Sequence, residues 1–134
     1  MAKSIPRHRK TAFELQNGRC CYCGFQMWQE SVEAFAKLHR ISVSQAKQFQ
    51  CTAEHLTARK DGGKDSRSNI AAACARCNLL RHQRKSAPGP LKYQELVQKR
   101  LDKGRWVSLS PQSRLDRSPP PDLARLFGIG QASK

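Results

Sequence analysis

The chain has 134 residues, which is enough for one domain and too few for two domains with substantial separate cores. Lys and Arg total 25 against 10 Asp and Glu, so the net charge is +15. Packing does not require such an excess, and it favours a polyanionic partner, most often nucleic acid, over a merely solubilising charge.

The composition also excludes some classes of protein. No apolar run approaches the ~20 residues of a membrane span. The charged start MAKSIPRHRK is followed by no apolar segment that would make it a secretory signal. We therefore expect an intracellular, cytoplasmic protein with no membrane partner. In a reducing compartment, its six cysteines indicate metal binding rather than disulfides.

The first third of the chain predicts short elements. Residues 1–10 are typical of a basic arm, and TAFELQ at 11–16 predicts a short helix ended by Asn17-Gly18, so that 1–19 form an N-terminal arm and helix. The apolar spacing within 28–38 predicts a helix, and a second one is expected over 43–50 with Ser42 or Ser44 as its N-cap. Together these helices form a helical insert at about 28–50.

The next elements predict a hairpin followed by helices. Residues 51–56 are a candidate strand, DGGKDSRSN at 61–69 is a turn-rich loop, and residues 70–73 are a brief second strand. A helix is expected from 74 to about 85, where the sequence has no Gly or Pro. After Pro88 and Pro90, residues 91–103 predict a helix within a C-terminal unit at 89–106. The Ser/Pro-rich sequence beyond Trp106 predicts a loosely ordered tail over 107–134.

The cysteine spacing predicts a structural zinc site. Cys20 and Cys23 form one C-x-x-C pair and Cys74 and Cys77 form another, and two such pairs make a tetrahedral four-thiolate site that is closed to chemistry. Gly24 follows the first pair directly, as a tight knuckle requires. Because Cys21-x-Cys23 is a poorer chelate spacing, we expect Cys20 rather than Cys21 to be the ligand.

A second pattern lies between the two cysteine pairs. An adjacent Glu54-His55 pair ends the first strand, Gly62-Gly63 follow in the loop, and the sequence continues to CARCN. The matching text, AEHLTARKDGGKDSRSNIAAACARCN, resembles the HNH endonuclease family. That resemblance implies an α+β fold, with a small zinc-stapled ββα-metal (treble-clef-like) core over 20–88 and added helices around it.

The resemblance also implies roles for individual residues. His55 would be the general base, Glu54 and Asn78 would bind a divalent metal, and Asn69 would hold the loop so that His55 is oriented. His82, one helical turn after Asn78, is either a third metal ligand or a surface histidine. Hydrolysis of a phosphodiester independently requires a base near neutral pKa and a cation, for which Mg²⁺ or Mn²⁺ suits the oxygen ligands.

Basic residues surround this pattern and indicate a phosphate-binding rim that gives affinity without base specificity. They are Arg59, Lys60, Lys64, Arg67, Arg76, Arg81, Arg84 and Lys85. The sequence therefore predicts a metal-dependent endonuclease that hydrolyses DNA. The alternative is a zinc-stapled nucleic-acid-binding module without catalysis, for which the Glu54, His55 and Asn78 set would have no use.

Overall fold

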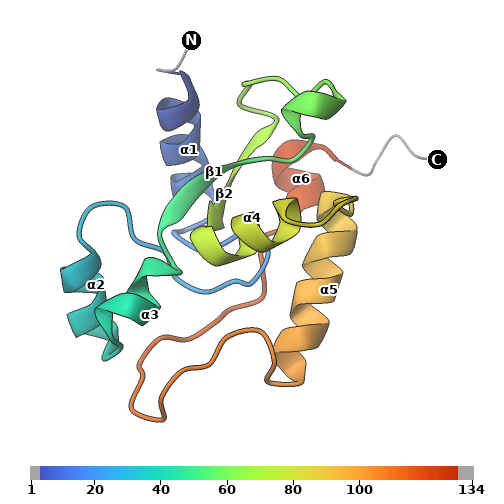
Figure 1. The fold of residues 1–134 in the computed structure, drawn as a ribbon. Coiled ribbons are helices and arrows are strands. Elements are labelled where there is room, and N and C mark those ends of the chain that lie inside the picture. The colour runs from blue at the N-terminus through green and yellow to red at the C-terminus, as the bar shows by residue number, and fades with distance from the viewer. Residues whose placement is uncertain (1–3, 130–134) are drawn as a thin grey trace.

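The computed structural model of the protein describes residues 4–129, and an antiparallel hairpin lies in the interior of the molecule (Figure 1). Strand β1 (Cys51–His55) pairs with β2 (Ile70–Cys74) in a register that sets Cys51 opposite Cys74 and His55 opposite Ile70. The strands confirm the expected α+β hairpin, and every residue of β2 is buried. Between them, the loop contains a short 3₁₀ helix, η1 (Arg59–Asp61).

Helix α1 (Ser4–Leu15) packs against both strands of the hairpin. The basic arm expected over residues 1–10 is therefore helical from Ser4 onward, and residues 1–3 lie outside the described part. Pro6 is compatible with this helix because it stands in the first turn, where its missing N–H has no partner to lose. The side chain of Gln16 then clamps Ala72, donating to its carbonyl oxygen at 2.8 Å and accepting from its N–H at 3.0 Å.

Helix α4 (Ala75–His82) follows β2 without a loop and packs against both strands. Cys74 is its N-cap, with Sγ accepting from the N–H of Cys77 at 3.4 Å. Helix α5 (Pro90–Asp102) begins with proline in its first turn and buries Tyr93 and Val97. Leu91, in the first turn of α5, is 38% exposed.

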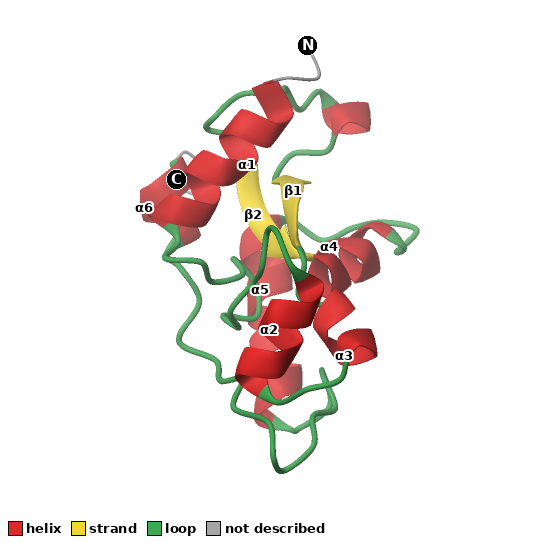
Figure 2. Ribbon diagram, turned by 90° about the vertical axis from the view of Figure 1, so that its left-hand side faces the viewer, coloured by secondary structure: helices red, strands yellow, loops and turns green. Residues whose placement is uncertain are grey.

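The helical insert consists of α2 (Val32–His39) and α3 (Val43–Lys47), which pack together at the end of the molecule away from the start of α1 (Figure 2). Helix α2 begins four residues later than the start of the predicted range, because Trp28 is held in an extended segment that pairs with Gln50. Its indole also donates to the carbonyl oxygen of Ala46 at 2.7 Å. Ser42 is the N-cap of α3 and forms a capping box with Gln45.

The C-terminal segment differs from the loosely ordered tail that its composition predicts. As far as residue 129 it packs on the domain, with Leu115, Leu123 and Phe127 buried. Helix α6 (Leu123–Phe127) is capped by the side chain of Asp122 and contacts α5. The three prolines at 119–121 lie before α6 and do not interrupt it. Helix α6 is amphipathic, because its apolar residues at 123 and 127 fall on one face. Residues 130–134 lie outside the described part.

None of the helices within residues 4–129 is long and apolar enough to cross a bilayer.

Candidate active site

The four expected cysteines meet in one buried cluster. The sulfur atoms of Cys20, Cys23, Cys74 and Cys77 all lie within 4.8 Å of one another. Gly24 closes the first pair at φ 81°, and its N–H donates to the carbonyl oxygen of Cys20 at 3.0 Å. The cluster contains Cys20 and excludes Cys21, as the chelate spacing predicts.

The chemistry of the cluster fits a cation bound by thiolates. Burial by itself raises the pKa of the Cys20 thiol, but hydrogen bonds from the neighbouring thiols lower it well below its usual range. Two backbone N–H groups, of Tyr22 and Cys74, donate to its sulfur at 3.4 and 3.3 Å. The indole of Trp106 donates to Sγ of Cys77 at 3.3 Å. Burial and the hydrogen bond with Cys20 instead raise the pKa of the Cys23 and Cys77 thiols well above its usual range. Without a cation the negative charge is therefore concentrated on Cys20, and a bound cation would allow all four sulfurs to be thiolates.

A pocket of about 350 Å³ brings the predicted catalytic residues together. It is lined by Ala53, Glu54, His55, Ala58, Arg59, Asn78 and His82. Adjacent residues of a strand face opposite sides, yet Glu54 and His55 both reach this pocket because β1 ends at His55. The pocket thus lies where β1, η1 and α4 meet.

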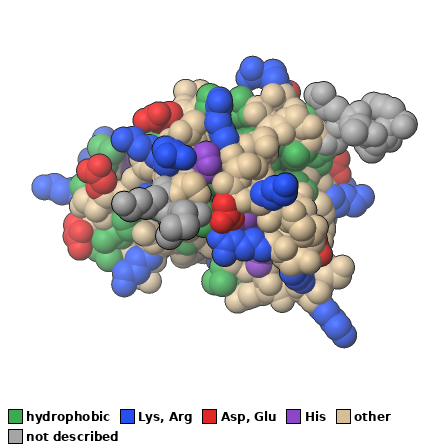
Figure 3. Space-filling view, turned by 90° about the horizontal axis from the view of Figure 1, so that it is seen from above, with side chains coloured by type: hydrophobic (Ala, Val, Ile, Leu, Met, Phe, Trp, Pro, Cys, Tyr) green, Lys and Arg blue, Asp and Glu red, His purple; other side chains and the backbone are tan. Residues whose placement is uncertain are grey.

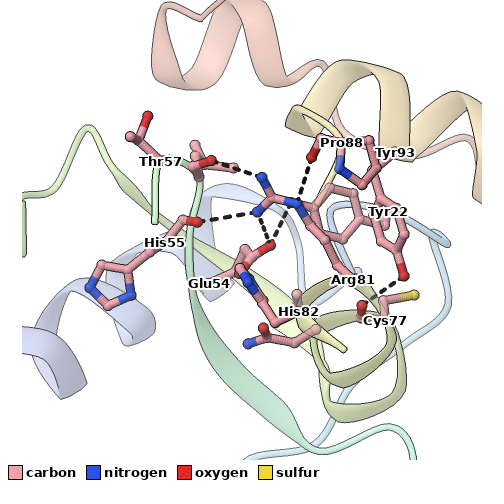
Figure 4. Close-up of polar contacts among 12 residues, drawn as sticks. Tyr22, Glu54, His55, Thr57, Cys77, Arg81, His82, Pro88 and Tyr93 are labelled. Atoms are coloured by element: carbon pink, nitrogen blue, oxygen red, sulfur yellow. Dashed lines mark hydrogen bonds and ion pairs between the residues drawn. The ribbon is translucent and has the colours of Figure 1, made fainter. Parts of the chain in front are cut away.

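Glu54 is fully buried and accepts three side-chain hydrogen bonds (Figure 4). Oε2 accepts from the hydroxyl of Tyr22 at 2.6 Å and from Nη1 of Arg81 at 2.7 Å. Oε1 lies 2.8 Å from Nε2 of His82. Burial raises the pKa of the Tyr22 hydroxyl well above its usual range, so this group remains a donor.

Arg81 does not lie on the basic rim where the sequence placed it. Its side chain is 5% exposed and pairs with Glu54. The guanidinium also donates to the backbone carbonyl oxygens of His55 at 3.2 Å, Leu56 at 3.1 Å and Pro88 at 3.1 Å (Figure 4). Because these acceptors occupy the N–H groups of the guanidinium inside the protein, Arg81 has a structural role. It is therefore removed from the residues expected to contact phosphate.

His55 has a partner that the sequence did not reveal. Its Nε2 lies 2.7 Å from Oδ1 of Asp65, and Arg59 donates to both oxygens of the same carboxylate at 3.2 Å. The hydrogen bond from His55, together with Arg59, lowers the pKa of Asp65. An ionised carboxylate only accepts hydrogen bonds, so Nε2 of His55 carries the hydrogen and the neutral ring has its lone pair at Nδ1.

Asn69 ties the two ends of the loop between the strands. Its Oδ1 accepts from the N–H of Thr57 at 2.8 Å, and its Nδ2 donates to the carbonyl oxygens of Thr57 and Lys64 at 3.0 and 2.9 Å. Gly63 packs so closely that a Cβ atom there would lie 1.7 Å from the carbonyl oxygen of Thr57. These contacts explain why a Gly-Gly pair follows Glu54-His55: the loop folds back tightly beside the histidine.

Asn78 and His82 lie one turn apart on α4 and both line the pocket. The Nδ2 group of Asn78 donates to Oγ1 of Thr52 at 3.0 Å and to the carbonyl oxygen of Ala53 at 3.2 Å. Both amide hydrogens are therefore used within the protein, which leaves Oδ1 as the atom for a ligand.

The remaining basic residues of the predicted rim differ in exposure. Arg59, Lys60, Lys64, Arg67, Arg84 and Lys85 are exposed. Arg76 is half-buried, with its guanidinium 5.3 Å from the centre of the Trp106 ring. Figure 3 shows Lys and Arg side chains spread over one face of the molecule, with histidine side chains between them.

Tyr22 is a further site residue that the motifs did not identify. It stands between two cysteines of the knuckle, is fully buried, and reaches Glu54 across 32 positions of sequence. Its position in the sequence could have predicted this contact. A tyrosine inside a closed metal knuckle is buried, and a buried hydroxyl needs a hydrogen-bond partner.

The comparisons agree with this geometry. The family model of the HNH endonuclease matches residues 20–84, which span the knuckle, the insert, the hairpin and α4. No curated protein and no solved structure matches the chain significantly. Residues 20–84, with their cysteine cluster and ββα core, belong to the HNH endonuclease family.

Proposed function

We propose that the protein is a metal-dependent endonuclease that hydrolyses phosphodiester bonds of DNA. The observation that carries this proposal is the convergence of Glu54, His55, Asn78 and His82 on one pocket beside exposed arginine and lysine side chains. A domain that only bound nucleic acid would have no need to bring a buried carboxylate and two histidines together in one pocket beside these basic side chains.

His55 acts as the general base. Asp65 accepts the hydrogen of Nε2 and orients the ring, so that Nδ1 takes the proton of the attacking water. Asn69 keeps the loop that carries Asp65 folded against the end of β1. The base is thus fixed by the loop rather than by its own strand alone.

The pocket has a donor set that fits a divalent metal such as Mg²⁺ or Mn²⁺. Oε1 of Glu54 and Oδ1 of Asn78 are hard oxygen donors, and Nε2 of His82 would add a nitrogen once its hydrogen has moved to Nδ1 or to solvent. These residues would hold the cation, which would supply positive charge to neutralise the phosphate and the leaving oxygen. Zn²⁺ in the cluster of Cys20, Cys23, Cys74 and Cys77 has a structural role, because four thiolates leave no position for chemistry.

DNA is held by its phosphates. The exposed side chains that we assign to this contact are Arg59, Lys60, Lys64, Arg67, Arg84 and Lys85, with half-buried Arg76 at the margin. Such contacts give affinity that falls steeply with salt and carries little sequence preference.

The test is incubation of purified protein with supercoiled plasmid and Mg²⁺ or Mn²⁺, read as nicked or linear product. Cleavage should stop on addition of EDTA, and His55→Ala should reduce the rate by about 10²- to 10⁴-fold, the usual contribution of a general base. Zinc content and DNA affinity of this variant should equal those of the parent. Cleavage by His55→Ala at the parent rate would contradict the mechanism, and DNA binding without any cleavage by the parent would favour the binding module.

A further inference from the structure

The carboxylate of Glu54 is divided between two environments. Oε2 faces the interior, where Tyr22 and Arg81 both donate to it at 2.6 and 2.7 Å. Oε1 faces His82, whose side chain is 35% exposed. One oxygen is therefore fully engaged by groups that solvent does not reach, and the other is directed to the pocket.

We propose that Tyr22 and Arg81 are positioning residues that hold Oε2 of Glu54 in the interior, so that Glu54 binds a divalent cation through Oε1 alone, beside Nε2 of His82. This inference rests on the proposed function, because it concerns the same metal. The cation would replace the hydrogen bond between Oε1 and Nε2 of His82, and the hydrogen of that bond would pass to Nδ1 or to solvent so that the lone pair of Nε2 faces the cation. A carboxylate free to rotate would offer either oxygen or both, and it would have to be ordered each time the cation bound.

The two positioning residues come from different parts of the fold. Tyr22 lies within the knuckle, directly between Cys21 and Cys23, and Arg81 lies on α4 one residue before His82. Arg81 is itself fixed by three backbone carbonyl groups, so the carboxylate is held by a rigid donor rather than by a flexible surface cation. The position of Oε1 is consequently set by the cysteine cluster and the helix together.

A matched pair of tyrosine substitutions tests the role of Tyr22. Tyr22 and Tyr93 are both fully buried, and their rings meet edge to face with centroids 4.8 Å apart. Each hydroxyl makes one hydrogen bond: Tyr22 donates to Glu54, whereas Tyr93 donates to the carbonyl oxygen of Cys77 at 2.9 Å. Tyr22→Phe and Tyr93→Phe therefore remove the same atom from neighbouring sites, and Glu54 loses a partner in the first variant alone.

The measurement is the affinity for Mn²⁺ in the zinc-loaded protein without DNA, read from the electron paramagnetic resonance signal of free Mn²⁺. We expect Tyr22→Phe to weaken Mn²⁺ binding by about 10- to 100-fold, the usual cost of losing a group that orients a metal ligand. Tyr93→Phe should retain the parent affinity. Arg81→Lys, which keeps the charge but not the fork of donors, should weaken Mn²⁺ binding as well if it folds.

Cleavage assays add a second reading of the same variants. High Mn²⁺ should restore plasmid cleavage by Tyr22→Phe to nearly the parent rate, because its defect is metal occupancy and not chemistry. Parent-like Mn²⁺ affinity in Tyr22→Phe, equal weakening in Tyr93→Phe, or absence of Mn²⁺ binding by the parent would each overturn the inference. Mn²⁺ binding that responds as expected in a parent that never cleaves DNA would instead contradict the proposed function and leave the positioning role intact.

Discussion

Glu54 is an acidic residue whose side chain is fully buried and forms an ion pair with the buried guanidinium of Arg81. Removing one partner of a buried ion pair leaves an uncompensated charge in the interior, which costs more than the pair itself contributes. Glu54 therefore has two roles that mutation can separate. One is the proposed role of offering Oε1 to a metal, and the other is to neutralise Arg81.

Two substitutions at position 54 should distinguish these roles. Glu54→Ala should lower the free energy of unfolding by about 3–5 kcal/mol, because Arg81 stays buried without its carboxylate. Glu54→Gln keeps a carbonyl oxygen for Arg81 and should cost less, while it still weakens Mn²⁺ binding through the lost charge. Urea denaturation followed by circular dichroism measures the first effect. Equal stability of the two variants would show that the pair with Arg81 contributes little.

At the scale of elements, the loop between β1 and β2 is held in place by Asn69 and by the close packing of Gly63 against Thr57. The loop carries Asp65, the partner of His55. The orientation of His55, the proposed base, therefore depends on a loop outside the two strands and on the small size of one glycine.

Gly63→Ala should disturb this loop and spare the rest of the domain. Its new Cβ would overlap the carbonyl oxygen of Thr57, so the backbone must move and Asp65 with it. We expect plasmid cleavage to fall by at least roughly 10-fold, as part of the ~10²–10⁴-fold that a general base supplies, with zinc content unchanged. Gly89→Ala is the control, because a Cβ at Gly89 meets no atom within 4 Å. A parent-like cleavage rate in Gly63→Ala would count against the role of the loop.

Elements with a strong local pattern were predictable from the sequence, and contacts distant in sequence were not. The strands, α5 and the capping serine of α3 follow from hydrophobic spacing, turn residues and cap chemistry. The cysteine cluster follows from ligand spacing. The length of α1 was missed because its basic residues suggested an arm. The buried position of Arg81 was missed because burial of a charge depends on a partner 27 positions away, which no local pattern reveals.

At the scale of the whole molecule, the C-terminal segment is a part of the core. Its Leu123 and Phe127 are buried, and the N–H of Ser118 donates to the carbonyl oxygen of Gly24 in the knuckle at 3.1 Å. A Cβ at Gly24 would lie 2.0 Å from the carbonyl oxygen of Ser118, so knuckle and segment fit together closely. The family match ends at residue 84, and the domain it describes is completed by residues outside that range.

Substitution of one buried leucine should demonstrate this dependence. Leu123→Ala should lower the free energy of unfolding by about 2–5 kcal/mol, the usual cost of removing a buried leucine side chain. Leu38→Ala is the control, since Leu38 is 69% exposed and its loss should change stability by less than about 0.5 kcal/mol. Thermal or urea unfolding of both proteins gives the comparison. An unchanged stability in Leu123→Ala would mean that the segment packs on the domain without supporting it.

The close fit between Gly24 and Ser118 joins two segments that are synthesised at different times, so the knuckle cannot reach its final packing until the C-terminal segment has been made. The knuckle leaves the ribosome first, Cys74 follows 51 residues after Cys23, and the segment that covers the knuckle follows later still. At translation rates of about 5–20 residues per second, the first two thiols wait for seconds before their partners appear. Glu54 cannot take its final position until Tyr22 and Arg81 have both been made. The pocket therefore forms late, and under the proposed function a nascent chain that has not passed α4 has no assembled site with which to cut nucleic acid.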